Sequence, residues 1–230
     1  MLFRHALFKT PPPMPSTHPI DLSLYLVLDP VLCGGEDGMI ETARAACAGG
    51  ATVVQLRAPG WKKRQLVECG RALKTVLAPY HVPLIVDDDA DVCLAVNADG
   101  LHVGQRDLTP EDARAIVGGD RILGLSVTTL AELTAADTTP IDYFGVGPVF
   151  ATPTKTDAEP ACGLDGLQAI TRAAGLPTVA IGGIKAFNAA DIVASGTDGI
   201  AVVSAVCGQP DPKAAAEKLL AIVKAAQTTP

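Results

Sequence analysis

The sequence is poor in aromatic residues and lacks the features that define several large protein classes. Phe, Tyr and Trp make up 4% of its 230 residues while 48% are hydrophobic, which predicts an aliphatic core. No apolar stretch approaches the roughly 20 residues of a membrane span. The six cysteines are scattered without a CxxC pair, which argues against zinc and favours free thiols in a reducing cytosol. These absences predict a cytoplasmic protein without a membrane segment.

Positive charge is also scarce. The chain has 18 Lys and Arg against 25 Asp and Glu, a formal net charge of −7, and its isoelectric point is near 5.0. This balance argues against nucleic acid or an anionic membrane as a partner, because their phosphates attract Lys and Arg. An anionic small molecule would therefore be held by a few local positive groups or by a metal ion.

The N-terminal segment MLFRHALFKTPPPMPSTHP lacks both the sustained hydrophobic region and the small-residue cleavage site of a signal peptide. Its proline content is typical of disorder. We expect residues 1–19 to form a disordered leader and residues 20–230 to form one domain without a linker.

From residue 24 onward, short apolar segments alternate with amphipathic, alanine-rich segments. The apolar segments have no polar face, as buried parallel strands should. They are residues 24–28, 52–56, 83–86, 100–103, 122–126, 143–145, 178–181 and 199–203. The clearest helical patterns are residues 39–50, 62–77, 110–119, 164–175, 187–196 and 212–227. This alternation predicts the α/β class and a single (β/α)8 TIM barrel, and the absence of GxGxxG after the first strand disfavours a doubly wound open sheet.

Barrels carry their chemistry at the carboxyl ends of the strands, and polar residues of this sequence cluster at those positions. Gln55 and Arg57 stand at alternate positions after the second strand, so they are expected to point the same way. Ser126 ends the fifth strand, where a local backbone contact is an equally good explanation. His102 lies within the fourth strand and is expected to be an interior or structural histidine.

A run of three aspartates, Asp87 to Asp89, follows the third strand, and Asp107 follows the fourth. Such acids also cap helices, Asp89 the next helix and Asp107 the one starting near Pro110. Taken together, Asp88 and Asp107 are carboxylates at adjacent strand ends. Mg²⁺ commonly binds one or two carboxylates together with substrate phosphate and water, so this pair is a candidate metal site.

The last three strands end in elements that suit phosphate. IGGI at residues 181–184 brings bare backbone to the barrel mouth, and VVS at residues 202–204 ends the eighth strand. Loops after strands seven and eight of barrels frequently bind phosphate through backbone N–H groups, although a simple tight turn would also explain the glycines. Residues 152–155, Thr-Pro-Thr-Lys, add hydroxyl donors and one cation.

The ordered segments QLR, VDDDAD, ADGLHVGQRD, LGLSVTT, GVGPVFATPTKTD, AIGGI and GIAVVSA, spread from about residue 25 to 205, resemble the thiamine-phosphate synthase family. The family consists of (β/α)8 barrels. The resemblance implies that the protein joins 4-amino-2-methyl-5-hydroxymethylpyrimidine diphosphate to a thiazole phosphate, with Mg²⁺-assisted release of diphosphate. It also implies a small homo-oligomer, such as a homodimer.

The resemblance implies a role for each matching position. Its catalytic positions are Arg57, Ser126 and Lys155, and the pyrimidine diphosphate would contact these together with Gln55 and Asp87. Its magnesium ligands would be Asp88 and Asp107. The thiazole phosphate would be bound by Thr152, Pro153, Thr154, Gly183, Val203 and Ser204.

Two positions depart from the family pattern. Pro59 stands where the family has a lysine, and Asp87 stands where it has an asparagine. Both changes make the site less favourable to an anion, unless Lys62 or Lys63 supplies the missing cation. A thiazole tautomerase-like isomerase and a non-catalytic ligand-binding paralogue therefore stay open as alternatives, although an isomerase would have no diphosphate to expel and no need of two metal-type aspartates.

Overall fold

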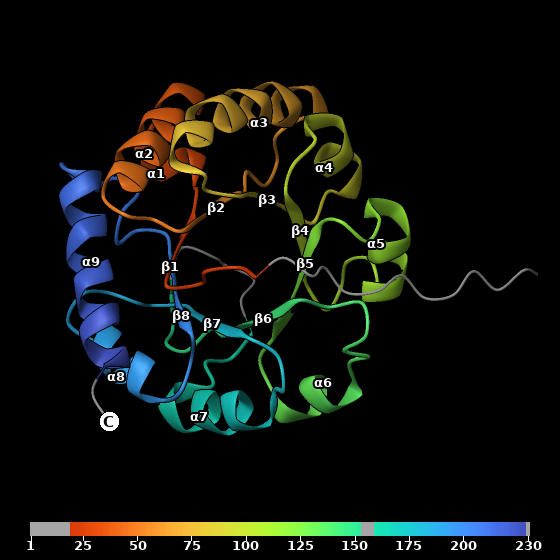
Figure 1. Ribbon diagram of the computed structural model, residues 1–230, viewed down its shortest axis with the longest axis vertical. Coiled ribbons are helices and arrows are strands. Elements are labelled where there is room, and N and C mark those ends of the chain that lie inside the picture. Colours follow the sequence, from red (N-terminus) through yellow and green to blue (C-terminus); the bar gives the residue numbers. More distant parts are fainter. Residues whose placement is uncertain (1–18, 153–158, 229–230) are drawn as a thin grey trace, which may run out of the picture.

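Each predicted apolar segment forms a short parallel strand, and the strands close into a barrel. The computed structural model describes residues 19–152 and 159–228. The strands pair in sequence order, and β8 returns to β1 (Figure 1). Their bounds are β1 Leu24–Val27, β2 Val53–Leu56, β3 Leu84–Asp87, β4 Gly100–Val103, β5 Ile122–Val127, β6 Tyr143–Val146, β7 Thr178–Ile181 and β8 Gly199–Val202. The (β/α)8 barrel prediction is confirmed, and every strand end lies within one residue of its predicted position.

Helices surround the barrel as an outer ring (Figure 1). They are α1 Pro30–Cys33, α2 Glu36–Ala48, α3 Lys63–Leu77, α4 Ala90–Val96, α5 Pro110–Val117, α6 Leu130–Ala135, α7 Gly163–Ala173, α8 Ala189–Ala194 and α9 Pro212–Gln227, with a 3-10 helix η1 at Ala78–Tyr80. Their ends follow local signals. Asp211 caps α9 by accepting a hydrogen bond from the Ala214 N–H, and Pro212 takes the first helical position as predicted.

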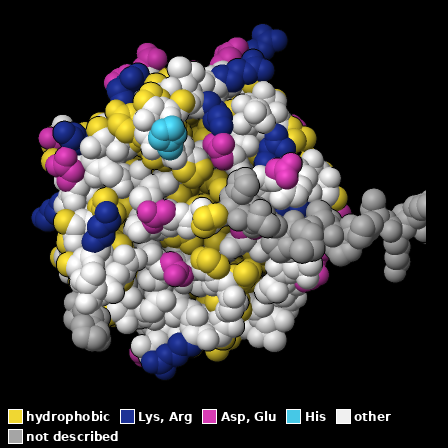
Figure 2. All heavy atoms as spheres, in the orientation of Figure 1, with side chains coloured by type: hydrophobic (Ala, Val, Ile, Leu, Met, Phe, Trp, Pro, Cys, Tyr) yellow, Lys and Arg dark blue, Asp and Glu magenta, His cyan; other side chains and the backbone are white. Residues whose placement is uncertain are grey.

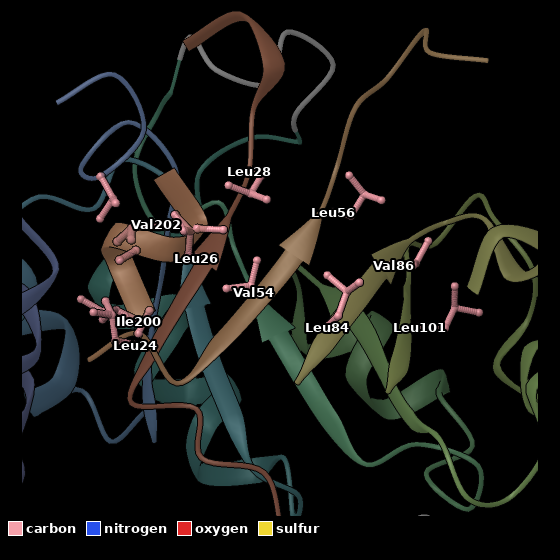
Figure 3. Close-up of a cluster of buried hydrophobic side chains, with 14 of the residues drawn as sticks. Leu24, Leu26, Leu28, Val54, Leu56, Leu84, Val86, Leu101, Ile200 and Val202 are labelled. Carbon is pink, nitrogen blue, oxygen red and sulfur yellow. The ribbon is translucent and has the colours of Figure 1, made fainter. Parts of the chain in front are cut away.

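Strand residues alternate between two aliphatic cores, because successive side chains of a strand point to opposite faces. Figure 3 shows the outer core between strands and helices, to which Leu24 and Leu26 of β1 and Leu28 just after it contribute. The residues in between fill the barrel interior. That interior core comprises Leu22, Tyr25, Val27, Val53, Ile85, Ile122, Tyr143, Val179 and Ala201. The same alternation decides which side chains reach the interior at the carboxyl ends of the strands.

Hydrophobic and basic side chains occupy different parts of the surface. Hydrophobic side chains gather in the middle of the face shown in Figure 2, and Lys and Arg lie mostly toward its rim. The six cysteines are free thiols, as predicted. Across the described ranges, none of the helices combines the length and the apolar character needed to cross a bilayer. Residues 1–18 of the predicted leader, and the predicted site residues Pro153, Thr154 and Lys155, lie outside the described residues.

Candidate functional site

The register of the barrel brings the inward-facing residues of neighbouring strands to one level. Asp87 is opposite His102 across β3 and β4, and Ser126 is opposite Gly145 across β5 and β6. Gln55 is opposite Ile85, one pleat below Asp87. The residues predicted from β2, β3 and β5 therefore face one mouth at the carboxyl ends of the strands, where barrels carry their sites.

A chain of hydrogen bonds crosses the barrel interior beneath this mouth. Gln55 Nε2 donates to the Tyr25 hydroxyl at 2.9 Å, and that hydroxyl lies 3.0 Å from the Tyr143 hydroxyl. The Tyr143 hydroxyl lies 2.9 Å from Nδ1 of His102, whose Nε2 lies 2.8 Å from Ser126 Oγ. Two predicted site residues, Gln55 and Ser126, are thus the two ends of one buried polar network. His102 is interior, as predicted, and it also holds Ser126.

The network stays uncharged at its tyrosines. Burial raises the pKa of Tyr25, and burial also raises that of Tyr143 well above its ordinary value. Both phenols therefore keep their protons at physiological pH and act as neutral donors and acceptors. Their hydroxyls are buried and engaged with each other, with Gln55 and with His102, so they hold Gln55 and His102 in place.

Two glycines create the space for this network. A Cβ at Gly124 would overlap the Tyr143 ring and Nδ1 of His102, and a Cβ at Gly145 would lie 3.0 Å from Cε1 of His102. Gly124 lies too close to the two rings for any side chain, whereas at Gly145 the His102 ring would have to shift by a few tenths of an ångström. Glycine at position 124 is therefore a packing requirement of the polar network.

Arg57 and Asp87 form an ion pair at the mouth. Arg57 Nε lies 3.2 Å from Asp87 Oδ2, and the two side chains are 20% and 16% exposed. The aspartate that departs from the family pattern thus neutralises the arginine expected to contact the diphosphate. The local charge change at Asp87 is therefore coupled directly to Arg57.

The lysines proposed as substitutes for the missing cation lie at the start of α3. Lys63 Nζ forms an ion pair with Asp89 and lies 2.9 Å from Asp91 Oδ1. Asp89 occupies the N-cap position of α4 but makes no side-chain cap hydrogen bond, since its carboxylate meets Lys63 instead. Lys62 is exposed at the N-cap of α3. Lys63 is therefore engaged by acidic residues at the N-terminus of α4.

Asp88 and Asp107 follow the adjacent strands β3 and β4. Asp88 has a left-handed backbone, with φ of 57°, and its N–H donates to the carbonyl of His102 at 2.9 Å. Asp107 Oδ2 accepts from the Gly104 N–H at 2.8 Å, while Thr109 provides the cap of α5. Both carboxylates are exposed. The described residues include no group of three or more His, Cys, Asp or Glu able to hold a metal, so an ion at these two carboxylates would need further ligands from substrate and water.

The opposite side of the mouth is built by the ends of β6 and β7. The Val149 N–H donates to the Ile181 carbonyl at 2.8 Å, and the Phe150 N–H donates to that of Gly182 at 3.1 Å. A Cβ at Gly183, where φ is 67°, would lie 2.7 Å from Cβ of Phe150. The glycines therefore let the loops after β6 and β7 pack against each other, and the half-buried Thr152 belongs to the first of them.

The end of β8 completes this side. Ser204 Oγ accepts a hydrogen bond from Lys185 Nζ at 2.7 Å, and Lys185 belongs to the loop that follows β7. Within the described parts of the chain, no protein acceptor meets the backbone N–H of Gly183 or of Ser204. Such N–H groups at strand ends are the donors that barrels use for phosphate.

The fold and the mouth define a (β/α)8-barrel protein with a candidate site for anionic small molecules at the carboxyl ends of its strands. The family model described as thiamine monophosphate synthase matches residues 24–206. The chain belongs to this family.

Relatives cover nearly the whole chain. The thiamine-phosphate synthase of Laribacter hongkongensis is 52% identical over 203 residues, 88% of this chain and 96% of its own. That of Xanthobacter autotrophicus is 52% identical over 209 residues, 91% of this chain and 99% of its own. The structure of thiamine phosphate pyrophosphorylase from Pyrococcus furiosus is 39% identical with a TM-score of 0.82, and the match covers 90% of this chain and 97% of that one.

Sequence reasoning missed several residues of the mouth. Tyr25 and Tyr143 are buried in strands and read as ordinary core, although a hydroxyl in an otherwise aliphatic interior implies a polar partner. Lys185 follows IGGI directly and is not among the predicted site residues. Its position one residue beyond a predicted phosphate-binding turn was the available signal.

Proposed function

We propose that this protein is a thiamine-phosphate synthase, a transferase that joins 4-amino-2-methyl-5-hydroxymethylpyrimidine diphosphate to thiazole phosphate. The observation that carries the proposal is the match along nearly the whole chain to synthases 52% identical to it. The polar residues gathered at one barrel mouth support it. Six free cysteines also suit a reducing, cytoplasmic setting.

The reaction exchanges one bond for another. The C–O bond between the pyrimidine methylene and diphosphate breaks, and diphosphate leaves with the bonding electrons. The lone pair of the thiazole nitrogen then forms the new C–N bond, giving thiamine phosphate. The amino group of the pyrimidine stabilises the carbocation-like centre, so the protein needs to position the substrates and stabilise the leaving group rather than transfer protons.

The polar network supplies the pyrimidine side of the site. Gln55 and Ser126 stand at its ends, and His102 and the neutral tyrosines fix their orientation. In the proposed complex, Gln55 and Ser126 present hydrogen-bonding groups to the pyrimidine substrate at positions set before it binds. Held in this way, the ring keeps its methylene facing the thiazole nitrogen.

Arg57 and Lys155 would bind the diphosphate, with Asp87 sharing Arg57 through their ion pair. Asp88 and Asp107 would hold Mg²⁺, and the bound ion would neutralise negative charge on the leaving diphosphate. Two exposed carboxylates on adjacent strand ends suit an ion that completes its coordination with substrate oxygens. Thr152, Pro153, Thr154, Gly183, Val203 and Ser204 would bind the thiazole phosphate.

The metal assignment has a direct test. Asp88→Asn and Asp107→Asn should each lower turnover sharply and raise the Mg²⁺ concentration for half-maximal rate, because each removes one negative charge from the ion. Circular dichroism and the melting temperature should stay near wild type, since both side chains are exposed. Asp91→Asn, an exposed acid on α4, is the matched control. Near wild-type turnover of both variants at limiting Mg²⁺ would remove the metal assignment.

One observation favours a second candidate, the non-catalytic ligand-binding paralogue. Asp87 engages Arg57, the cation expected at the diphosphate. A site weakened in this way could retain thiazole phosphate while binding pyrimidine diphosphate poorly. Calorimetry with each ligand separates the two candidates, because the paralogue would bind only the thiazole phosphate.

A further inference from the structure

Among the residues that the structure describes, Lys185 has no acidic partner, in a protein whose net charge is negative. It is half-buried in the loop after β7, and its Nζ donates to Ser204 Oγ at 2.7 Å. Across residues 19–152 and 159–228, no carboxylate forms an ion pair with it. A lysine has three N–H donors, and the serine hydroxyl uses one of them. The ammonium group thus keeps donors and charge for an anion.

The backbone around Lys185 is held in place. Its N–H donates to Asn188 Oδ1 at 2.8 Å, and Asn188 Nδ2 donates to the Gly183 carbonyl at 3.1 Å. Asn188 therefore connects the glycine turn to the start of the lysine side chain. From this anchored position the side chain extends to the loop after β8, where Ser204 lies.

These two loops carry three donors, the backbone N–H of Gly183, the backbone N–H of Ser204 and the ammonium group of Lys185. The hydrogen bond from Lys185 Nζ to Ser204 Oγ brings the ammonium group from the loop after β7 to the loop after β8. Backbone donors alone bind phosphate in many barrels, and a lysine adds a point charge to them. This arrangement has the chemistry of a phosphate monoester site rather than of a metal or an apolar ligand.

The geometry points to Lys185 as a residue that binds the phosphate of the thiazole substrate and selects the phosphorylated form over the free alcohol. This inference rests on the proposed function for the identity of the ligand, although a phosphate site here would exist without it. Asp87 neutralises Arg57 at the diphosphate end of the mouth. Lys185 would add positive charge at the thiazole end and so compensate for part of this loss. The lysine–serine hydrogen bond would then orient the ammonium group before the ligand arrives.

The experiment compares two acceptor substrates in wild type, Lys185→Met, Lys185→Arg and Lys218→Met. Lys218 is exposed on α9, so its replacement removes the same charge away from the mouth. For Lys185→Met we expect kcat/KM for thiazole phosphate to fall roughly 10-fold or more, in line with hydrogen bonds to charged groups. The value for the unphosphorylated thiazole alcohol should be unchanged, and Lys185→Arg should recover part of the loss.

A lysine that only joins two loops would give a different result. Lys185→Met would then lower kcat/KM equally for both acceptors, and this outcome would overturn the inference. Unchanged affinity for thiazole phosphate would overturn it as well.

Calorimetry with inorganic phosphate separates this inference from the proposed function. Wild type and Lys218→Met should bind phosphate more tightly than Lys185→Met, and added salt should reduce the difference. If no variant makes thiamine phosphate but this difference appears, the proposed function fails and the lysine site stands. Equal phosphate binding by wild type and Lys185→Met would remove the lysine site whatever the activity.

Discussion

Replacing Asp87 by Asn removes the carboxylate that pairs with Arg57. The charged atoms are 3.2 Å apart and the two side chains are 20% and 16% exposed. At an effective dielectric constant of about 20, two unit charges at this distance attract by about 5 kcal/mol before desolvation and salt screening. Measured net values for partly exposed pairs are much smaller, so we expect roughly 1–2 kcal/mol to become available for the diphosphate. That corresponds to roughly 5-fold to 30-fold tighter binding.

Steady-state kinetics test this expectation. In Asp87→Asn, kcat/KM for the pyrimidine diphosphate should rise, mainly through a lower KM, while KM for thiazole phosphate stays constant. Pro59→Lys should add to the effect by restoring a cation, and the double variant should exceed both single variants. Asp91→Asn serves as the control, because Asp91 pairs with Lys63 and is 67% exposed.

The opposite result would refute the electrostatic reasoning. If Asp87→Asn leaves pyrimidine diphosphate affinity unchanged, Asp87 does not compete with the substrate for Arg57. If the substitution weakens the affinity, Asp87 is needed to position Arg57. If Pro59→Lys with Asp87→Asn also fails to improve affinity, the mouth is adapted to a less anionic ligand. The paralogue would then become the preferred function.

Three further predictions concern packing, a thiol and the N-terminus. Gly124→Ala should lower the free energy of unfolding by about 1–3 kcal/mol and raise KM for the pyrimidine substrate, because the added Cβ overlaps Tyr143 and His102; thermal unfolding with wild-type stability would contradict it. A hydrogen bond from Cys207 lowers the pKa of Cys33 to about 7, so iodoacetamide labelling of Cys33 should rise through pH 7, and Cys207→Ala should move that midpoint upward; an unchanged midpoint would contradict the assignment. Deleting residues 1–19 should leave melting temperature and turnover nearly unchanged, and a large loss of either would mean that the leader packs on the barrel.

The fold follows from patterns that are local in the sequence. Short apolar strands and glycine-terminated helices depend on neighbouring residues, so β4 and β7 have the bounds that the sequence predicts. Alternation along β2 placed Gln55 in the barrel interior, because side chains of a strand point to opposite faces in turn. The inward orientation of a side chain near the end of a strand could therefore be predicted from the sequence alone.

Pairing between distant residues was not readable in this way. Tyr25 and Tyr143 are 118 positions apart, and their hydroxyls meet only because β1 and β6 face each other across the closed barrel. Lys63 follows the end of β2 closely in the sequence, yet in the structure its ammonium group pairs with Asp89 at the N-cap of α4. A long side chain can reach several charged groups, and the group with which it pairs depends on distances in the folded protein.

The most direct test of the central claim is a turnover assay on the purified chain. The protein would be incubated with pyrimidine diphosphate, thiazole phosphate and Mg²⁺, and thiamine phosphate and diphosphate would be quantified together. The account predicts equal amounts of the two products, and none when Mg²⁺ is chelated. Absence of thiamine phosphate at saturating concentrations of both substrates would contradict it.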